Sequence, residues 1–358
     1  MIVQDSSEGP ILCILSYNGK DVLREAVASA LSISDRFRSI VVVDNASTDG
    51  TAEMVRSEFP QVGVVRVPVN HGPAGGRNHG LREAAGDLIL FVDNDVALTR
   101  GCVDELVAAL RANPAAVLAT PAVVYAHQPD TIQYDGAEIH CLGLQALLDE
   151  DVKLADARRE PRRVGSMVSC CFLIDRRRMP CADYFDESFF IYFEDHDFGS
   201  RLRLLGRDVL SVPAAVCYHG KGTEGLSIRA MGSYSSTRVY HLIRNRWLFL
   251  LKNFSARTLL LLTPLFLVYE SAQFVIAVKK GWLGHWSRAS WWVLSHLPEV
   301  LSRRRVIQKL RRVPDRDILV GGRIPFRKEL STSAFERLAR GLLDAIVTGY
   351  WKAVAVLI

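Results

Sequence analysis

Short apolar runs alternate with helical patterns over the first 114 residues of the chain. Four runs rich in β-branched residues predict strands at residues 11–16, 39–44, 62–69 and 87–96. Apolar positions at helical spacing predict helices at residues 20–31, 52–59, 70–86 and 101–114. Polar side chains gather where the predicted strands end. This alternation predicts an α/β sheet whose functional site lies outside the carboxyl ends of the strands.

Beyond residue 120 the pattern weakens and then changes character. Residues 121–165 predict loops, short strands and a charged surface segment. Residues 258–278 are 21 mostly apolar residues, enough to span a bilayer, but Pro264, Glu270 and Gln273 interrupt them. Four tryptophans and the basic run SRRRVIQKLRR follow. Helices lying in a membrane interface fit this better than a spanning hairpin, and helices packed on the rest of the protein or on another subunit are the alternative.

Charge divides the chain near residue 229. Residues 1–228 hold 22 Lys and Arg against 32 Asp and Glu (22 − 32 = −10), whereas residues 229–358 hold 22 against 7 (22 − 7 = +15). All six tryptophans lie in the second part. We therefore predict an acidic domain over residues 1–228 and a basic, Trp-rich amphipathic helical region over residues 229–358. Nucleic acid is not the expected partner of the basic region, because its long apolar runs favour a membrane surface.

The N-terminus and the cysteines predict a chain in a reducing compartment. MIVQDSSEGP lacks the basic and apolar segments of a signal peptide. The seven cysteines form no CxxC pair, so we expect reduced and partly buried thiols.

Two common nucleotide-binding motifs are missing. No GxGxxG follows the first predicted strand, which argues against a dinucleotide site and against a nucleotidyltransferase. HGKGT at residues 219–223 lacks the upstream glycine of a P-loop and has Gly222 where Ser or Thr is needed.

Two carboxylates, Asp93 and Asp95, end the fourth apolar run. An Asp-rich turn explains them if the side chains accept hydrogen bonds from nearby backbone amides. A shared divalent cation also explains them, because Mg²⁺ and Mn²⁺ prefer oxygen ligands. The triplet alone favours the turn, since short motifs recur by chance. The rest of the chain decides between the two.

Six segments in order closely resemble family 2 glycosyltransferases of the GT-A fold. They are SYNG, VVVDNASTDGT, NHGPAGGRNHG, FVDNDV, FFIYFEDHDFGSRLRLLG and VCYHGKG, and they cover about residues 10–225. The chain is most similar to the bacterial branch that includes rhamnosyltransferases of cell-wall and O-antigen assembly. The resemblance implies a GT-A fold with a mixed, mainly parallel central sheet, followed here by a C-terminal helical region that associates with the membrane.

The resemblance assigns a donor site for a sugar nucleotide. Asp44 would accept a hydrogen bond from the imide N–H of uracil or thymine; an Asx-turn is its structural alternative. The family pattern places the other donor contacts on three segments: Asn18; the Gly-rich loop with Asn70, Gly75, Arg77 and Asn78; and Asp93 with Asn94. We further expect residues 220–235 to form a flap over the diphosphate, with Lys221 and Arg229 as charge partners.

The same resemblance implies the metal, the base and the acceptor site. Asp95 would bind Mg²⁺ or Mn²⁺ on the diphosphate, and His219 would complete the metal site. Asp195 matches the base of an inverting transfer, which must reach the acceptor hydroxyl. Tyr192, Glu194 and His196 would contact the acceptor; an acidic first turn complementing a helix dipole is the alternative for the acids. Asp197 is expected to pair with Arg201 at i+4.

These residues predict a metal-dependent, inverting glycosyltransferase. It would move a sugar, rhamnose being the first choice, from a UDP- or dTDP-sugar to a glycan or a polyprenyl-linked saccharide. It would work at the cytoplasmic face of the cell membrane as a peripheral protein. The alternative from another class is a non-catalytic scaffold that binds sugar nucleotides at the membrane.

Overall fold

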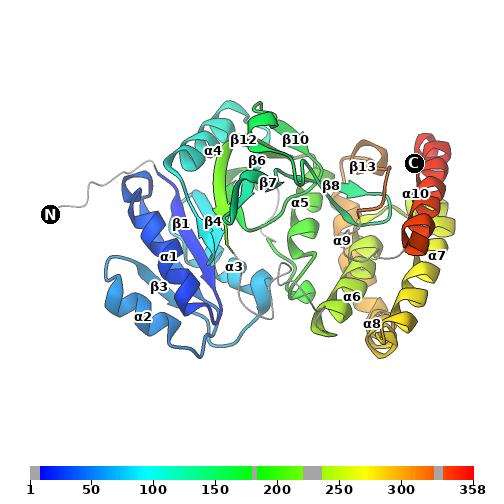
Figure 1. Ribbon diagram of the computed structural model, residues 1–358, viewed down its shortest axis with the longest axis horizontal. Coiled ribbons are helices and arrows are strands. Elements are labelled where there is room, and N and C mark those ends of the chain that lie inside the picture. The colour runs from blue at the N-terminus through cyan, green and yellow to red at the C-terminus, as the bar shows by residue number, and fades with distance from the viewer. Residues whose placement is uncertain (1–8, 180–183, 221–235, 326–333) are drawn as a thin grey trace.

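The four apolar runs near the N-terminus form neighbouring parallel strands in the computed structural model, which describes residues 9–179, 184–220, 236–325 and 334–358 (Figure 1). β1 (Ile11–Ser16) lies between β2 (Ser39–Asp44) and β4 (Leu88–Asp93), and β3 (Gly63–Arg66) pairs with β2. The predicted alternation of strands and helices is confirmed. The helices that follow these strands are α1 (Lys20–Leu31), α2 (Thr51–Glu58), α3 (Gly72–Glu83) and, after the short β5 (Val96–Ala97), α4 (Arg100–Ala112).

One internal strand in the second half of the sheet, β11 (Cys171–Asp175), runs antiparallel to its neighbours. β11 is antiparallel to both β4 and β6 (Ala116–Tyr125), so β6 points the same way as β1 to β4. β12 (Asp208–His219) pairs with β6 in parallel. α5 (Glu194–Leu204) precedes β12 in the chain. The sheet is therefore mixed and mainly parallel, as predicted. Its antiparallel additions are β5 on β12, β7 (Gln128–Tyr134) on β6 and β10 (Arg162–Val164) on β12.

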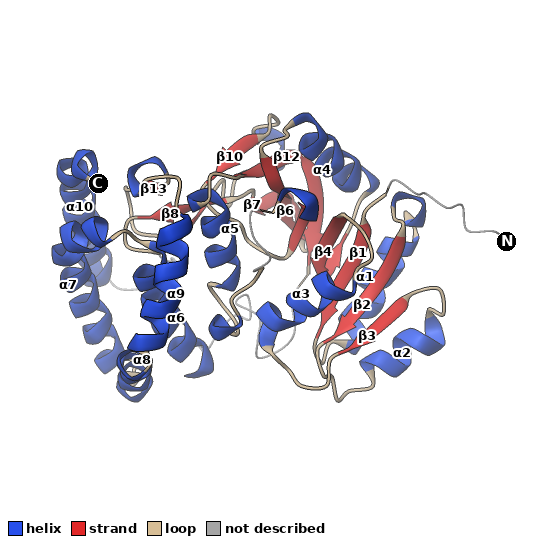
Figure 2. Cartoon of the chain, turned by 180° about the vertical axis from the view of Figure 1, so that it is seen from behind, coloured by secondary structure: helices blue, strands red, loops and turns tan. Residues whose placement is uncertain are grey.

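Side chains alternate between the two faces of the sheet, and a different helix set covers each face. Leu12 and Ile14 of β1 belong to a core cluster that includes residues of α1, α2 and α4. Ile11 and Cys13 point the other way, into a cluster with residues of α3 and α5. Figure 2 shows α3 on the face opposite α1. Because α3 and α5 share one face, the Gly-rich loop and the acidic EDHD stretch lie on the same side of the sheet.

The basic C-terminal part is helical, as its amphipathic pattern predicts. Its helices are α6 (Ser236–Asn253), α7 (Ala256–Lys279), α8 (Leu283–Ser295), α9 (Leu297–Leu310) and α10 (Ala334–Val354). A second, small sheet connects this part to the middle of the chain, because β13 (Leu319–Val320) adds in parallel to β8 (Ala137–His140), which pairs with β9 (Gln145–Leu147). Short 3-10 helices occur at Ser34–Arg36, Leu154–Asp156, Arg176–Arg178, Glu187–Phe189, Asp315–Asp317 and Ala355–Leu357.

A buried lysine joins the C-terminal helices to the sheet domain. Lys252 of α6 is 2% exposed, and its Nζ lies 2.7 Å from Asp186 Oδ2 and 2.7 Å from Asp197 Oδ1. Burial alone would raise the pKa of Asp186, but Lys252 and Arg303 outweigh it and hold the pKa of this carboxyl well below its ordinary value. An apolar cluster surrounds these charges and combines Phe189 with residues of α6, α7, α9 and α10. The division at residue 228 stays a proposal based on composition, since the two parts share this core.

α7 is long and apolar enough to cross a bilayer by length and composition. Its mean hydropathy is 1.8 over the most apolar window, of which 22% is buried in the protein. Pro264 lies inside the helix. This is weak evidence for a membrane span, because core helices of soluble proteins pass the same test.

The buried lysine yields a stability prediction. Lys252→Met leaves Asp186 and Asp197 buried with less compensating charge, so we expect the free energy of unfolding to fall by about 3–5 kcal/mol. Urea denaturation followed by tryptophan fluorescence measures it. Lys309→Met, on the exposed surface of α9, is the control and should change stability by less than about 0.5 kcal/mol. Equal effects of the two substitutions would mean that Lys252 does not join the two parts.

Candidate active site

The carboxyl ends of three strands bring Asp44 and Asp93 to one edge of the sheet. Strand register places Ser16 of β1 beside Asp44 and Leu15 beside Asp93. Asp44 is fully buried, and its Oδ1 accepts a hydrogen bond from Ser47 N at 3.0 Å. Its Oδ2 is buried without a hydrogen-bond donor in the described part of the chain, and Arg66 Nε lies 3.6 Å away. A buried, unsatisfied carboxylate oxygen is costly, so this atom is suited to accept a ligand's N–H.

Asn18 ties the loops after β1 and β2 together. Its backbone N–H donates to Ser47 Oγ at 3.0 Å, and its Oδ1 accepts from Thr48 N at 2.8 Å. Asn18 has a φ of 46°, the left-handed region that asparagine tolerates better than most residues. The side chain predicted to contact the donor thus shapes the loop around Asp44.

The Gly-rich loop, residues 70–80, forms the start of α3 in the structure and packs closely against its neighbours because its glycines lack side chains. Gly72 has a φ of +69°, and a Cβ there would overlap the carbonyl oxygen of Phe190. A Cβ at Gly75 would overlap His71. Asn70 closes the loop, since its Oδ1 accepts from Gly72 N at 2.8 Å and from Asn45 Nδ2 at 3.0 Å. The glycines therefore allow α3 to begin against the turn that precedes α5.

Arg77 of α3 connects the two acidic motifs. It is 3% exposed, and its guanidinium donates to Asp93 Oδ1 at 2.8 Å and to Glu194 Oε1 at 3.1 Å. Burial opposes its charge, but Asp93, Glu194 and Asp195 outweigh burial and raise the pKa of Arg77 above its ordinary value. Arg77 therefore remains a cation, and a planar guanidinium can hold two carboxylates at fixed positions.

Asn78, the neighbour of Arg77, is fully engaged with the chain itself. Its Nδ2 donates to Phe185 O and to Glu187 Oε1, both at 2.9 Å, and its Oδ1 accepts from Phe185 N at 3.0 Å. The structure thus places this predicted donor contact against residues 185–187, where it holds the segment leading to α5.

Asp95 and His219 meet because β5 pairs with the end of β12. His219 is opposite Val96 in this antiparallel pair, and its Nε2 lies 3.3 Å from Asp95 Oδ1. Its Nδ1 lies 2.9 Å from Gln133 Oε1. Burial would lower the pKa of His219, but Cys170 and Asp95 outweigh it and raise the pKa to about 9. The two residues predicted to bind the metal, 124 positions apart in the chain, thus lie close together, and a carboxylate with an imidazole is a donor set that suits a divalent transition metal.

Asn94, between the two aspartates, faces the loop after β1. Its Nδ2 donates to Ser16 Oγ at 3.2 Å, and a Cβ at Gly19 would overlap this amide. The three side chains of the DND triplet therefore have three different partners. Asp93 contacts Arg77, Asn94 contacts Ser16, and Asp95 contacts His219.

Glu194 and Asp195 begin α5 in different environments. Asp195 accepts hydrogen bonds from His196 N at 2.7 Å and from Ser169 N at 3.2 Å. Glu194 has one buried oxygen without a hydrogen-bond donor in the described structure. Burial, followed by repulsion from Asp195, raises the pKa of Glu194 to about 8, and burial also raises the pKa of Asp195. The backbone N–H groups stabilise the charge of Asp195, so Asp195 ionises more readily than Glu194.

Tyr192 lies in a strained turn immediately before these acids. Phe190, Tyr192 and Phe193 have φ values of 62°, 64° and 70°. Each non-glycine residue in this region costs on the order of 1–2 kcal/mol, and such residues cluster at functional sites. We call residues 189–193 the strained turn. Tyr192 is half-buried there, beside the predicted base.

His196 of α5, predicted to contact the acceptor, is buried in the structure. It is 1% exposed, its Nδ1 lies 2.8 Å from Ser166 Oγ, and its ring packs 4.3 Å from the ring of Phe249 of α6. Burial lowers its pKa to about 3, so it is neutral. Its contact with the acceptor stays a prediction. The predicted pair of Asp197 and Arg201 is confirmed, with Arg201 Nε 2.8 Å from Asp197 Oδ2.

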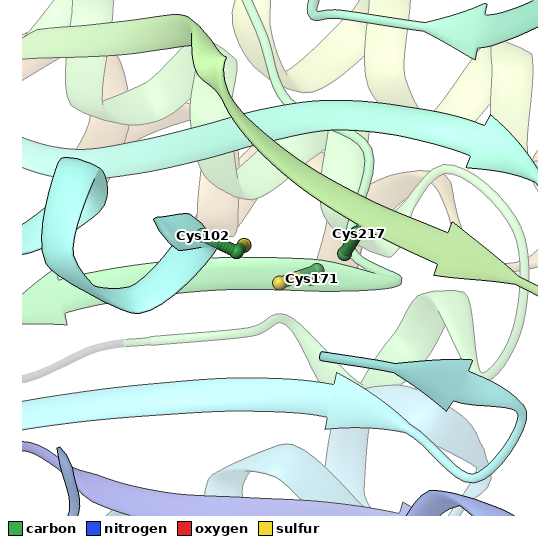
Figure 3. A group of neighbouring side chains, drawn as sticks. All are labelled: Cys102, Cys171 and Cys217. Atoms are coloured by element: carbon green, nitrogen blue, oxygen red, sulfur yellow. The ribbon is translucent and has the colours of Figure 1, made fainter. Parts of the chain in front are cut away.

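Six cysteines in the described part of the chain are buried and free, as expected. Cys102, Cys171 and Cys217 bring their sulfur atoms within 4.8 Å of one another (Figure 3). Three thiols at this spacing can hold a soft metal ion. They belong to the apolar core on one face of the sheet, so we assign them to packing. The predicted flap with Lys221 and Arg229 lies outside the described residues, apart from Gly220.

Two contributors to the site were not singled out from the sequence. Ser169 supplies a backbone N–H to Asp195, and Asn245 of α6 contacts the strained turn. A backbone donor leaves no signature in a sequence. A single asparagine in a basic amphipathic helix looks like a surface residue until the tertiary structure buries it.

Residues 11–178 match the family model described as glycosyl transferase family 2. An N-acetylglucosaminyl-diphospho-decaprenol L-rhamnosyltransferase of Mycobacterium tuberculosis is 29% identical over 236 residues, which cover 59% of this chain and 76% of the relative. A putative teichuronic acid biosynthesis glycosyltransferase of Bacillus subtilis is 26% identical over 143 residues, 36% of this chain and 57% of that protein.

A crystal structure of GalNAc-T7 with UDP, GalNAc and Mn2+ has the same fold. The TM-score is 0.56 at 17% identity, and the likeness covers 72% of this chain and 49% of the solved one. This chain thus spans about half the length of that structure. The matching fold is the GT-A fold, as predicted. The family model, the relatives and the fold agree, and residues 11–178 form a glycosyl transferase family 2 domain.

Proposed function

We propose that this glycosyltransferase transfers a sugar with inversion from a UDP- or dTDP-sugar to a glycan or a polyprenyl-diphosphate-linked saccharide. The meeting of Asp95 with His219, beside Asp93 at the carboxyl edge of the sheet, is the observation that carries the proposal. Rhamnose is the leading donor sugar. The mycobacterial relative is named as an L-rhamnosyltransferase, which supports this choice. That relative is named for a lipid-linked acceptor, which supports an acceptor of the same class here.

The donor nucleotide would lie along the carboxyl ends of β1, β2 and β4. Asp44 Oδ2, buried and without a donor among the described residues, would accept the imide N–H of uracil or thymine. Asn18, Asn70 and Gly75 shape the backbone that lets the nucleotide approach. Asn94 and Asn78 hold the neighbouring loops, whereas Asp93 is 32% exposed and is able to reach the ribose or the sugar.

Asp95 and His219 are the residues that would hold a divalent cation. Such an ion, Mg²⁺ or Mn²⁺, neutralises charge on the leaving diphosphate when it is bound. His219 must give up its proton to act as a ligand, so we expect metal binding to strengthen as pH rises. The solved structure of GalNAc-T7, which has the same fold, contains Mn²⁺, and this supports a divalent cation in general.

Asp195 would act as the base. As the acceptor oxygen attacks C1 from the face opposite the diphosphate, its proton passes to the Asp195 carboxylate. The two backbone N–H groups on Asp195 keep it ionised and fixed. Protonated Glu194 would donate a hydrogen bond to the acceptor, and Tyr192 would wall the acceptor pocket.

We also propose peripheral binding to the cytoplasmic face of the membrane through the outer C-terminal helices. Figures 1 and 2 place α7 and α10 side by side at the end of the molecule away from the sheet. Large apolar side chains are exposed there, among them Leu260, Leu267, Val275, Leu338 and Leu342. A cavity of about 610 Å³ next to them is lined by Arg323, Arg337, Arg340 and Lys352. Apolar side chains beside cations suit an anionic lipid surface.

The donor site is tested by nucleotide binding. We expect UDP or dTDP with Mn²⁺ to raise the melting temperature of the wild type by several degrees, as mass action requires for a ligand at about 100 times its Kd. Asp95→Ala should abolish the metal-dependent part, and Asp44→Asn should abolish the preference over CDP. Glu105→Gln, exposed on α4, is the control. A wild type that no nucleotide stabilises would refute the donor site and favour the scaffold.

The base is tested by turnover. Asp195→Asn keeps the size of the side chain but cannot accept the proton, so we expect kcat to fall by about 10²–10⁴-fold. Binding of the nucleoside diphosphate with Mn²⁺ should change little. The measurement is release of dTDP from dTDP-rhamnose in the presence of N-acetylglucosaminyl-diphospho-polyprenol. Full turnover by the variant would exclude Asp195 as the base.

Membrane binding is tested by flotation with vesicles. We expect the chain to bind vesicles containing phosphatidylglycerol and to bind pure phosphatidylcholine poorly. Leu338→Gln with Leu342→Gln removes exposed apolar area and should weaken binding at least about tenfold. Glu105→Gln, at the other end of the molecule, is the control. Unchanged binding of the double variant would exclude this face as the contact.

A further inference from the structure

The strained turn carries the backbone conformation on which the start of α5 depends. Its residues at positive φ are Phe190, Tyr192 and Phe193, and none is glycine. Such a turn persists only where its surroundings hold it. Phe193 is the last residue before α5, and its carbonyl accepts the helix hydrogen bond from Asp197 N at 2.8 Å. A change in the turn would therefore move the first turn of α5.

Asn245 of α6 holds the turn from the C-terminal region. It is fully buried, and its Nδ2 lies 2.9 Å from Phe189 O, 2.8 Å from Ile191 O and 2.7 Å from Tyr192 O. An amide group has two hydrogens, so the three carbonyls share them. One side chain thus lies within hydrogen-bond distance of three backbone carbonyls of the strained turn, whose own backbone hydrogen bonds include Ile191 N to Phe189 O at 2.8 Å.

Arg244 also binds the backbone next to the turn, and it fixes the side chain of Asn245. Its guanidinium donates to Ser188 O and Phe189 O, both at 2.8 Å, and its Nε donates to Asn245 Oδ1 at 2.8 Å. The guanidinium also lies over the ring of Trp292 of α8, 4.7 Å from its centre. Two consecutive residues of one helix therefore contact the backbone of residues 188–192.

The turn contacts the donor side of the site as well. Gly72, at the start of α3, lies against the carbonyl of Phe190, and Ala74 N is 3.5 Å from that oxygen. The next residues of α3 lead to Arg77, which holds Glu194. The strained turn is therefore a common support for the Gly-rich loop and for the acids of α5.

We propose that Asn245 and Arg244 are positioning residues for the transfer reaction. By holding the strained turn, α6 fixes the first turn of α5 and with it the Asp195 carboxylate at the acceptor hydroxyl. This inference rests on the function proposed above, and it makes the C-terminal helical region part of the catalytic apparatus as well as a membrane contact.

The test compares substitutions at adjacent positions of α6 in the full chain. Asn245→Asp keeps the shape but turns an oxygen toward three carbonyls, and Asn245→Ala removes the donors without adding charge. We expect kcat to fall roughly 100-fold for each, as for a small misplacement of a catalytic group. The KM for dTDP-rhamnose and the affinity for dTDP with Mn²⁺ should change less, by about tenfold at most, because Asp44, Asp95 and His219 lie at strand ends and only the start of α3 contacts the turn.

A control and a second measurement separate positioning from loss of stability. Arg246→Gln removes a buried side chain that donates to Leu142 O at 2.7 Å and pairs with Glu270, away from the turn. It should lower the melting temperature yet keep kcat per folded molecule. Hydrogen–deuterium exchange at residues 186–198 should accelerate in both Asn245 variants and not in Arg246→Gln.

Each result decides something different. Wild-type kcat in Asn245→Asp, or the same kcat loss in Arg246→Gln, would overturn the inference. So would unchanged exchange at residues 186–198. If the wild type transfers no sugar from any donor, the proposed function fails, and the exchange measurement still decides whether Asn245 holds the turn.

Discussion

The site depends on one buried guanidinium. Arg77 lies between Asp93 at the end of β4 and Glu194 at the start of α5, and it remains charged because these acids outweigh the cost of burial. Without this cation the neighbouring charges of Asp93 and Asp195 would lose the guanidinium that compensates them in a region of low dielectric. The glycines before Arg77 follow from the same constraint, since α3 must begin in contact with the strained turn for its arginine to reach both acids.

The distribution of ionisation between Glu194 and Asp195 is a second consequence of this arrangement. Neighbouring carboxylates that differ in their backbone donors separate in pKa, which gives one site both a proton acceptor and a proton donor. The chain achieves this with the backbone N–H groups of residues 169 and 196. A side-chain substitution at Ser169 would therefore leave the hydrogen bonds to Asp195, the proposed base, intact, whereas a change in backbone position would not.

The sequence predicted well what depends on local pattern and poorly what depends on distant contacts. The strands from Ile11 to Asp93 and their helices follow from apolar periodicity, and motif resemblance named both Asp95 and His219. The burial of His196 was not predicted, because a motif gives the order of residues and not the side of the helix that each occupies. Lys252 and Asn245 escaped notice because their partners, Asp186 and the strained turn, lie more than 50 residues away. Their burial is decided by tertiary packing alone.

The pairing of β13 with β8 has a consequence for synthesis on the ribosome. β1 to β4 and their helices connect neighbours in the chain, so this half can fold while later residues are still being made. The small sheet, however, waits for Leu319 and Val320, which join residues 137–147 only after more than 170 further residues have emerged. α5 waits in the same way for α6, whose Asn245 holds the turn before it. The nascent chain would thus complete β1 to β4 first, the support of α5 next, and the small sheet only after α6 to α9 have been made.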